Sequence, residues 1–522
     1  MNNGKICVSV CAETADEMIA NIKRAEQFAD VIEVRFDCLA VEEFDLNGTT
    51  WKTKWGEIVN ARAAGKKTFW DRVLGSARKD IISTLRSCEQ GGRRTLSEEE
   101  RHDFWNSGCQ TEFCDVEDTG LIDQGEWTCG KRIVSYHDFS GVPEDLENIY
   151  SRLLGNVEAD IIKIAITPHD ITDNIVLWRL LKHAKSSGKE IIPIAMGEAG
   201  KWTRILGLAH GAYLTYASLD AGKETADGQL TAKDLIETYR VKDLDKTTEV
   251  FGVIGDPVSQ SLSPYMHNAE FAAAGVNAVF MHLLVKDLDA FILRMVKPET
   301  REVELNFGGF SVTMPHKQAI IPHLDAIDPT AAKIGAVNTI KIDDGKLTGY
   351  NTDAHGFITP LLARFGDVRD ARVAVFGAGG ASRACVYALQ QEGADVTVFG
   401  RDLQKAKAFA DEFGIKYEQL TADNRQLTTD IIVDATPLGM KGPLEDESLF
   451  TADELSGVKF VYDLVTSAAD TPIVQAAKAA GVPAIGGLEM LIAQGVKQFE
   501  IWTGKKARSD KMREILLARM RG

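Results

Sequence analysis

The chain has 522 residues, of which 44% are hydrophobic and 26% charged, and its formal net charge at pH 7 is −17. This length exceeds one ordinary hydrophobic core and predicts two or more domains. The acidic balance and the lack of a basic stripe argue against nucleic acid or an anionic membrane surface as partner. No apolar run reaches the length of a membrane span. The net charge does not exclude a small anionic substrate, because the binding of such a substrate depends on local clusters of Arg and Lys.

Seven of the 8 cysteines lie in the first quarter of the chain, and none forms a Cys-x-x-Cys pair. A structural zinc site is therefore not expected, and no other metal is implied. Several cysteines lie in apolar segments ("ICVSVC", "TEFCDVE"), where we expect buried free thiols and infer a reducing compartment. The start, "MNNGKICVSVCAET", resembles neither a signal nor a transit peptide. We expect a cytoplasmic protein, or a plastid one if a leader was removed.

Apolar segments alternate with helical patterns through the first 220 residues. The expected strands are, in order, "KICVSV", "VIEVRF", "DIISTLR", "TEFCDVE", "RIVSYH", "DIIKIAI", "EIIPIAM" and "GAYLTYA". Helical segments such as "TADEMIANIKRAEQFA" lie between most of them. Eight βα units predict a closed (β/α)8 barrel, with an open doubly wound sheet as the alternative. A charged segment follows, so we place a domain boundary near residues 240–248. A second α/β series then begins with "VFGVIGDPVSQSLSP".

The active site of such a barrel lies at the C-terminal ends of its strands. Lys163 is the most informative residue there, because burial within "DIIKIAI" would lower its pKa and favour a neutral amine that attacks a carbonyl. His137 on the adjacent strand would transfer a proton beside it. Arginines would bind a carboxylate and hydroxyls. The polar residues at or beyond the strand ends are Glu33, Arg35, Arg86, His137, Lys163, Arg204, Thr225 and Gln229.

Each of these residues has a structural alternative. Lys163 would point outward between strands and helices, His137 would be a structural histidine, and Arg35 would form an inner salt bridge with Glu33. The functional interpretation depends on all of them falling at strand ends in one barrel register.

The motifs "EVRFD", "TLR…GG", "SYHDF", "DIIKIA" and "GQ" resemble those of type I 3-dehydroquinate dehydratases, over nearly all of residues 1–235. The resemblance implies that Lys163 forms an imine with the substrate ketone and that His137 removes and returns protons. It also implies a set of substrate-binding residues: Ser9, Glu33, Arg35, Arg86, Arg204, Thr225 and Gln229.

One position departs from that family in a way that bears on activity. The family usually has glutamate directly before the "GG", where it orients the histidine, and this chain has Gln90, preceded by Glu89. Gln90 would orient His137 by a hydrogen bond without raising its basicity as a carboxylate does. The dehydratase would then be slowed, or Glu89 would substitute through a local shift. The family's serine before "AxGQ" is Thr225, which keeps the hydroxyl.

A glycine-rich turn links the strand "ARVAVFG" to the helix "ASRACVYALQQEG", and the strand "ADVTVFGRD" follows. This context is typical of a Rossmann domain, in which the pyrophosphate lies at the helix N-terminus. Ser382 stands at the last position of the glycine fingerprint, and a turn without a ligand is the alternative. We expect cofactor contacts from Gly377, Ala378, Gly379, Gly380 and Ala381.

The end of the second Rossmann strand selects the nicotinamide cofactor. NAD-binding domains place Asp or Glu there for the ribose hydroxyls, whereas Gly400 is followed here by Arg401, with Lys405 one turn later. Two cations near a 2′-phosphate favour NADP. Surface charge unrelated to the cofactor is the alternative, and Asp402 is the residue that argues against NADP.

The segments "SLSPYMHN", "GFSVTMPHK", "GAVNTI" and "GYNTDAHG" are dense in small polar residues, as a polyol substrate would require. Lys317 and Asp353, if brought together, would exchange a proton with a carbonyl as a hydride arrives. With "ATPLGM", "VYDLV" and "GGLEMLIAQGVKQFEIWTG", these segments resemble shikimate dehydrogenases across residues 250–515. The resemblance implies Lys317 and Asp353 as the catalytic pair. It implies contacts to the substrate or the nicotinamide from Ser261, Ser263, Thr313, Asn338, Gln494, Thr436 and Met490.

Together the halves resemble the plant-type fusion of the two families, in which the product of the barrel is the substrate of the dehydrogenase. We expect domains at 1–240 (barrel), 248–354 with 486–522 (substrate binding) and 355–485 (NADP binding). The expected ligands are 3-dehydroquinate, 3-dehydroshikimate and shikimate. The alternatives are a dehydrogenase fused to a weakened or inactive barrel, and a relative acting on quinate. Two dehydrogenase positions, Ser311 and Thr466, depart from the family, and the oligomeric state stays open.

Overall fold

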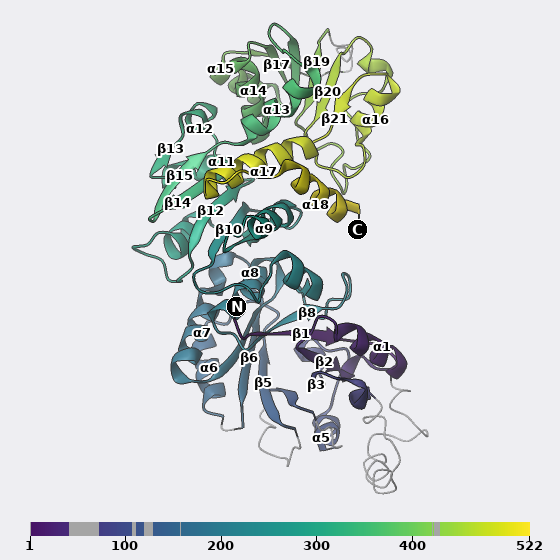
Figure 1. The fold of residues 1–522 in the computed structure, drawn as a ribbon, viewed down its shortest axis with the longest axis vertical. Coiled ribbons are helices and arrows are strands. Elements are labelled where there is room, and N and C mark those ends of the chain that lie inside the picture. Colours follow the sequence, from purple (N-terminus) through teal and green to yellow (C-terminus); the bar gives the residue numbers. More distant parts are fainter. Residues whose placement is uncertain are drawn as a thin grey trace. The chain divides into compact units, whose positions relative to one another are not determined.

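The computed structural model describes residues 2–40, 73–106, 111–118, 129–156, 158–419, 421 and 428–521. The chain divides into two compact units, one of Met1–Thr248 with His282–Asn306 and one of Glu249–Met281 with Phe307–Gly522. Figure 1 shows the elements of each unit by label.

The first unit contains eight parallel strands that follow one another around the sheet in chain order, with β1 paired to both β2 and β8 (Figure 1). This confirms the expected barrel order. The β7–β8 seam has no strand pairing in the described residues, although the Tyr213 N–H donates to the Ile191 carbonyl across it at 2.9 Å. The strands are β1 (Lys5–Val10), β2 (Val31–Arg35), β3 (Asp80–Thr84), β4 (Phe113–Glu117), β5 (Lys131–His137), β6 (Ile161–Ile166), β7 (Glu190–Ala195) and β8 (Leu214–Ser218), followed by the short β9 (Leu230–Thr231).

The helices of this unit bury one apolar face each against the strands. In α1 the buried residues Ala15, Met18, Ile22 and Ala25 recur at helical spacing, and the Thr14 hydroxyl caps the helix by accepting from the Glu17 N–H. The helices are α1 (Ala15–Ala25), α5 (Glu98–Asn106), α6 (Leu146–Leu154), α7 (Ile175–Ser187) and α8 (Gly197–His210), with short turns η1 (Phe36–Cys38), η2 (Leu74–Ser76), η3 (Cys88–Gln90), η5 (Ile171–Asn174) and η6 (Asp234–Thr238).

The barrel interior is layered along its axis. Each strand contributes at least one apolar residue, such as Cys7, Val31 and Ile161, to a single buried cluster. Two residues further along, where strand alternation returns a side chain to the same face, stand polar groups such as Glu33 and Lys163. Because the strands are parallel and these polar residues come later in each strand, the polar layer lies nearer the C-terminal ends of the strands than residues such as Val31 and Ile161 do.

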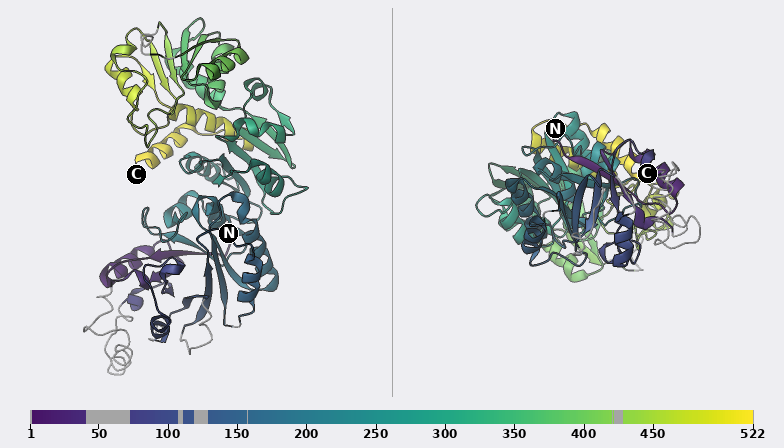
Figure 2. Two further views of the ribbon diagram at one scale, coloured as in Figure 1. Left: turned by 180° about the vertical axis from the view of Figure 1, so that it is seen from behind. Right: turned by 90° about the horizontal axis from the view of Figure 1, so that it is seen from below.

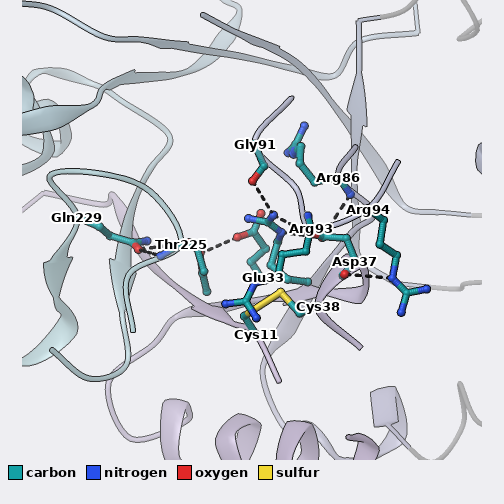
Figure 3. Close-up of a disulfide and its surroundings, with 12 residues drawn as sticks. Cys11, Glu33, Asp37, Cys38, Arg86, Gly91, Arg93, Arg94, Thr225 and Gln229 are labelled. Carbon is teal, nitrogen blue, oxygen red and sulfur yellow. Dashed lines mark hydrogen bonds and ion pairs between the residues drawn. A yellow bond between two sulfur atoms is a disulfide. The ribbon is translucent and has the colours of Figure 1, made fainter. Parts of the chain in front are cut away.

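Cys11 and Cys38 form a disulfide across 27 residues of sequence, with a Cα–Cα distance of 5.4 Å (Figure 3). The expectation of free thiols in the apolar segments is therefore wrong for Cys11, the last residue of "ICVSVC". Helix α1 returns the chain from β1 to β2, and this brings the residues after the two strands within bonding range. Cys7 and Cys114 are buried thiols outside any disulfide, as expected.

The second unit begins with a mixed sheet in the order β11-β10-β12-β14-β15-β13, in which β10 pairs in parallel with β12 and β12 antiparallel with β14. Helix α17 (Leu488–Thr503), near the C-terminus, packs along α13 and against this sheet (Figure 1). The elements up to β15 are β10 (Glu249–Gly255), α9 (Ser263–Ala273), β11 (Ala278–Leu284), β12 (Phe307–Val312), α11 (His316–Ala319), η8 (Ile321–His323), β13 (Ala326–Ile327), α12 (Pro329–Ile334), β14 (Thr339–Asp343) and β15 (Lys346–Tyr350). Two further elements, α10 (Leu288–Phe291) and η7 (Ile292–Val296), lie within His282–Asn306 and so belong to the first unit.

A parallel sheet in the order β18-β17-β16-β19-β20-β21 follows, which confirms the expected Rossmann arrangement. Alternate residues of β16 join different hydrophobic clusters, with Val373 and Val375 on one side and Ala374 and Phe376 on the other, and helices flank both faces (Figure 2). The elements are α13 (Asp353–Phe365), β16 (Arg372–Phe376), α14 (Gly380–Gln391), β17 (Asp395–Gly400), α15 (Leu403–Phe413), β18 (Lys416–Gln419), β19 (Ile431–Asp434), η10 (Asp453–Leu455), β20 (Phe460–Asp463), α16 (Pro472–Ala479), β21 (Ala484–Ile485), α17 (Leu488–Thr503) and α18 (Ser509–Arg521).

None of the helices in the described ranges combines the length and the apolar character needed to cross a bilayer.

Candidate active sites

A pocket opens at the C-terminal ends of the barrel strands, and every residue singled out in the first half lines it. These residues are Ser9, Glu33, Arg35, Arg86, His137, Lys163, Arg204, Thr225 and Gln229. Gln90, Phe139 and Tyr216 complete much of the wall. Lys163 therefore points into the barrel, and the alternative of an outward orientation is wrong.

The Lys163 ammonium is buried but is not surrounded by apolar groups alone. Its Nζ donates to Asp115 Oδ2 at 2.7 Å and lies 4.0 Å from Glu33 Oε1. The ring of Tyr216 lies 4.4 Å from Nζ. The expectation of a lysine among isoleucine and alanine side chains is thus incomplete, because the Asp115 carboxylate of β4 lies beside its Nζ.

Asp115 joins Lys163 to a second cation, since Arg86 NH2 lies 2.6 Å from Asp115 Oδ2. Burial opposes ionisation of this carboxyl, but Arg86 and Lys163 outweigh it and hold its pKa well below the usual range. The carboxylate is fully buried, and its Oδ1 has no hydrogen-bond partner in the part of the chain that the structure describes. Asp115 is consequently a fixed negative charge beside the reactive amine.

His137 meets Gln90 rather than Glu89. Its Nδ1 lies 3.2 Å from Gln90 Oε1, while Glu89 is exposed. Burial lowers the pKa of His137 well below its ordinary value, and the nearby Arg86 and Lys163 charges add to the effect. His137 is therefore neutral near pH 7 and has a ring nitrogen available to accept a proton.

Two arginines of the pocket, Arg35 and Arg204, differ in their hydrogen-bond partners. Arg35 makes two 2.8 Å contacts to Asp37, so the alternative of a salt bridge to Glu33 is wrong. Arg204 is buried; among the described residues its Nε has no partner, and its NH2 has the Asp227 carbonyl at 3.5 Å as its one hydrogen-bond acceptor. Burial lowers the pKa of Arg204 to about 10. A desolvated guanidinium of this kind is suited to bind an anion.

Hydroxyl and amide groups close the rest of the pocket. Ser9 Oγ donates to Glu33 Oε2 at 2.6 Å, and Thr84 Oγ1 donates to Glu33 Oε1 at 3.0 Å. The Thr225 N–H donates to Gln229 Oε1 at 2.8 Å, which fixes the segment after β8 (Figure 3). These groups are preorganised to hydrogen-bond substrate hydroxyls.

Four predicted residues of the second unit form one hydrogen-bonded cluster. Lys317 Nζ lies 2.5 Å from Asp353 Oδ2, and Asn338 Nδ2 donates to Asp353 Oδ1 at 2.7 Å. The same amide reaches Gln494 Oε1 at 3.5 Å. Lys317 and Asp353 are 36 residues apart in sequence, so the pairing predicted from "SVTMPHK" and "GYNTD" is a tertiary contact.

The other expected substrate contacts lie at neighbouring element ends. Ser261 and Ser263 are at the start of α9, where the Ser263 N–H donates to Ser261 Oγ at 3.3 Å. Thr313 directly follows β12, and its N–H donates to the Ile254 carbonyl of β10. Ser311 and Thr466, the two positions that differ from the dehydrogenase motifs, have different surroundings. Ser311 is buried and accepts a hydrogen bond from Gln498 Nε2 at 2.9 Å, whereas Thr466 is exposed.

The glycine turn after β16 has the geometry that a dinucleotide requires. Gly377 has φ +109°, and a Cβ there would meet the Ala435 carbonyl oxygen at 2.9 Å. A Cβ at Gly379 would point into open space. Helix α14 begins at Gly380, whose Cβ position lies 3.5 Å from Lys317 Cδ. The glycine turn and Lys317 thus lie side by side, and the residues fit a nicotinamide dinucleotide.

Asp402, the residue after β17 that argued against NADP in the sequence, has a structural role. This residue caps α15, and its Oδ1 accepts from the N–H groups of Gln404 and Lys405 at 3.0 and 3.1 Å. Arg401 and Lys405 are exposed beside it. Because the Asp402 carboxylate is engaged in capping, the side chains left for a ribose substituent are cationic. Thr436 lies after β19, where it donates to Asp434 Oδ1, and Met490 is buried in α17.

Family models match both halves. The type I 3-dehydroquinase model matches residues 6–246, and the shikimate dehydrogenase substrate binding domain matches 253–340. The shikimate/quinate 5-dehydrogenase model matches 361–449, and the shikimate 5′-dehydrogenase C-terminal domain matches 487–517. A chloroplastic bifunctional 3-dehydroquinate dehydratase/shikimate dehydrogenase of Arabidopsis thaliana is 32% identical over 99% of this chain and 84% of its own.

The chain belongs to the bifunctional 3-dehydroquinate dehydratase/shikimate dehydrogenase family.

The dehydrogenase half also resembles single-activity proteins. A shikimate dehydrogenase (NADP+) of Methanopyrus kandleri is 38% identical over 53% of this chain and 98% of its own. A crystal structure of Thermus thermophilus shikimate 5-dehydrogenase with NADP(H) and shikimate is 35% identical, covers 52% of this chain and 99% of its own, and has a TM-score of 0.46.

The prediction from sequence missed three buried polar residues of these sites. Asp115 pairs with Lys163 in the dehydratase barrel, Asp37 pairs with Arg35, and Gln498 holds Ser311 in the dehydrogenase. Strand alternation in "FCDVE" places Asp115 on the inner face and could have revealed it. Gln498 lies 187 residues from Ser311, and no local pattern indicates that contact.

Proposed function

We propose that the barrel dehydrates 3-dehydroquinate to 3-dehydroshikimate and that the dehydrogenase half reduces 3-dehydroshikimate to shikimate with NADPH. One observation carries the proposal most directly: Lys163 and His137 line a single pocket with the buried, carboxylate-free Arg204. A reactive amine, a neutral base and an anion-binding group are the parts that imine-mediated dehydration of an anionic ketone requires.

In the barrel, Lys163 passes a proton to His137 and attacks the substrate ketone as a neutral amine. The proton then returns to the hydroxyl of the carbinolamine, which leaves as water and gives a cationic imine. His137 removes a proton next to the imine carbon and returns it to the departing hydroxyl, which leaves as water. Hydrolysis of the imine restores Lys163, so one water molecule is lost overall. Asp115 lies 2.7 Å from Lys163 Nζ, and its negative charge stabilises the iminium that forms there. Arg204 binds the substrate carboxylate, and the hydroxyl contacts come from Ser9, Glu33, Arg35, Arg86, Thr225 and Gln229.

In the dehydrogenase half, Lys317 donates a proton to the carbonyl oxygen of 3-dehydroshikimate. Asp353 holds the Lys317 ammonium in place and is itself fixed by Asn338. NADPH supplies the hydride when it is bound. The remaining contacts are assigned to the carboxylate (Ser261, Ser263), the hydroxyls (Thr313, Asn338, Gln494), the nicotinamide (Thr436, Met490) and the phosphates (Gly377, Ala378, Gly379, Gly380, Ala381).

NADP rather than NAD is proposed as the cofactor because Arg401 and Lys405 are exposed after β17. A 2′-phosphate placed there would gain charge-assisted hydrogen bonds from both. The domains are proposed at 1–240, 248–354 with 486–522, and 355–485. The ligands are small molecules, with neither nucleic acid nor membrane as partner. The location is cytoplasmic, or plastid if a leader was removed.

Two additions to one cuvette test the function. 3-Dehydroquinate alone should produce the ultraviolet absorbance of a conjugated enone, and NADPH added afterwards should be consumed as that absorbance falls. Enone formation would contradict the alternative of an inactive barrel, for which Gln90 is the sole support. No enone, with NADPH consumed once 3-dehydroshikimate is supplied, would leave the dehydrogenase as the one activity. Faster turnover of quinate with NAD would favour the quinate alternative.

A further inference from the structure

The Cys11–Cys38 disulfide lies beside the dehydratase pocket rather than in a remote part of the fold. Both cysteines line a hollow that shares Arg35, Gly91 and Thr225 with the pocket containing Lys163 (Figure 3). Cys11 is partly exposed in this hollow, whereas Cys38 is 6% exposed. A reductant that enters the hollow therefore reaches the sulfur of Cys11 first.

The residue next to Cys38 is a buried hub of hydrogen bonds. Asp37 is 1% exposed, and its carboxylate receives both contacts from Arg35. The same carboxylate accepts from the backbone N–H groups of Arg86 at 3.3 Å and Arg93 at 3.1 Å. The Asp37 carbonyl accepts from Arg94 Nε at 3.2 Å. Asp37 thus holds both ends of segment 86–94.

Segment 86–94 carries the groups that position the reacting side chains. Arg86 contacts Asp115, the partner of Lys163. Gln90 contacts His137 at 3.2 Å. A continuous set of short contacts therefore leads from the disulfide through Asp37 to the histidine and the lysine, while the dehydrogenase cluster around Lys317 contains none of these residues.

Backbone hydrogen bonds also lie beside η1 in the described part of the chain. The Ala40 N–H donates to the Glu13 carbonyl at 2.8 Å, and the Leu39 N–H donates back into η1 at 3.3 Å. The disulfide is the covalent constraint between the residues that follow β1 and β2. Opening it would remove that constraint, so the position of η1, and with it that of Asp37, would depend on non-covalent contacts alone.

We propose that the Cys11–Cys38 disulfide is a redox-sensitive positioning element of the dehydratase, an inference that rests on the function proposed for the barrel. A thiolate of a dithiol reductant attacks the Cys11 sulfur, forms a mixed disulfide and releases Cys38 as a thiolate that takes up a proton. The second thiol of the reductant then displaces Cys11. The protein gains two electrons and two protons, and the reductant becomes a disulfide. Reduction loosens η1, so Asp37 no longer fixes segment 86–94 and dehydration slows.

The dehydrogenase half provides an internal control for the test. The full chain is prepared oxidised, treated with dithiothreitol, and assayed for both activities in the same sample, with alkylation and mass measurement to count thiols. We expect two additional alkylated cysteines and a fall in the kcat of dehydration of about 10- to 100-fold, as misplaced catalytic groups produce. Reduction of 3-dehydroshikimate should stay unchanged, and reoxidation should restore dehydration.

Variants separate this device from general destabilisation. Cys11→Ser and Cys38→Ser should both show the reduced rate and no response to dithiothreitol. Cys88→Ser removes the exposed free thiol of segment 86–94 and should keep the full response. A dehydration rate that is unchanged after two new thiols appear would overturn the inference alone, as would the absence of a Cys11–Cys38 bond or an equal fall in both activities. No enone from the oxidised chain would overturn the proposed function of the barrel.

Discussion

The side-chain oxygen of Gln90 lies 3.2 Å from Nδ1 of His137 in the dehydratase barrel. An amide oxygen accepts from Nδ1–H and so leaves Nε2 with a free lone pair toward the pocket. A carboxylate at position 90 would do the same and would also stabilise the imidazolium. Gln90 therefore orients the base without the gain in basicity that a carboxylate would give.

Gln90→Glu should raise the pKa of His137 and strengthen it as a base. Because His137 must be neutral to react, the acid limb of kcat/KM for dehydration should move upward by about one pH unit. The plateau rate should rise by a few-fold, as general-base catalysis responds to basicity. Gln90→Ala is the control, since it removes the orienting contact and should lower the plateau without the upward shift. Identical profiles for Gln90→Glu and the parent chain would contradict this role.

Lys163 is the nucleophile in the proposed reaction, and its variants should separate chemistry from charge. Lys163→Arg keeps a cation next to Asp115 but cannot form an imine, so dehydration should be lost to the level of Lys163→Ala. Borohydride with 3-dehydroquinate should add the mass of the reduced substrate adduct to the parent chain alone. Both variants should retain reduction of added 3-dehydroshikimate. A trapped adduct in Lys163→Arg would place the imine on another lysine.

The barrel order and the lining of its pocket could be predicted because both follow from local patterns. Strand alternation fixes which residues face inward, and this brought Lys163 and His137 into one pocket as expected. The partners of those residues were harder to foresee. Asp115 lies on β4, and its importance depends on cations from β3 and β6 that converge only when the sheet curves.

The disulfide and the cap formed by Asp402 show a second limit. Cys11 and Cys38 are 27 residues apart in a chain with several free cysteines, and spacing alone selects no pair among them. Asp402 follows a Rossmann strand as a ribose-binding acid would, and its role as a helix cap depends on its backbone conformation. Sequence patterns assign faces and element ends well, whereas the partner chosen by a polar side chain is a tertiary property.

Lys317→Ala should abolish reduction while dehydration continues, so that 3-dehydroshikimate accumulates from 3-dehydroquinate. The reason is that Lys317, fixed by Asp353 at 2.5 Å, supplies the proton to the carbonyl oxygen. Asp353→Asn should lower kcat more than it changes the KM for NADPH. Lys333→Ala, an exposed lysine of α12, is the matched control and should keep both rates. Consumption of NADPH by Lys317→Ala at the parent rate would refute the assignment.

Arg401→Ser should weaken NADPH binding more than NADH binding. A charge-assisted hydrogen bond to the 2′-phosphate contributes about 1.5 kcal/mol or more, so the KM for NADPH should rise roughly 10-fold. The KM for NADH should change little, because NADH lacks that phosphate. Lys407→Ser, an exposed cation of α15, the helix that follows Arg401, should leave both values unchanged. Equal changes for the two cofactors would show that Arg401 does not contact the 2′-phosphate.

Asp434 should make the stability of the dehydrogenase half depend on pH. Burial, with Asp463 on the neighbouring strand, raises the pKa of Asp434 to about 7, whereas an unfolded aspartate has a pKa of about 3.9. Between these values the folded state holds a proton that the unfolded state has lost, so stability falls as pH rises from about 4 to 7. Asp434→Asn removes this loss and should stabilise the folded state by on the order of 2–4 kcal/mol at pH 8, with little effect near pH 4.

Asp430 provides a control of opposite sign in the same sheet. Hydrogen bonds from Arg372 lower the pKa of Asp430, so its contribution to stability is present at neutral pH and is lost as pH falls below the unfolded value. Asp430→Asn should therefore lower the Tm at pH 8, where Asp434→Asn raises it. Calorimetry of both variants at pH 5 and pH 8 measures the difference. A Tm of Asp434→Asn that falls at pH 8 would mean that Asp434 is ionised and paired in the folded protein, because an uncompensated buried carboxylate cannot be the more stable state.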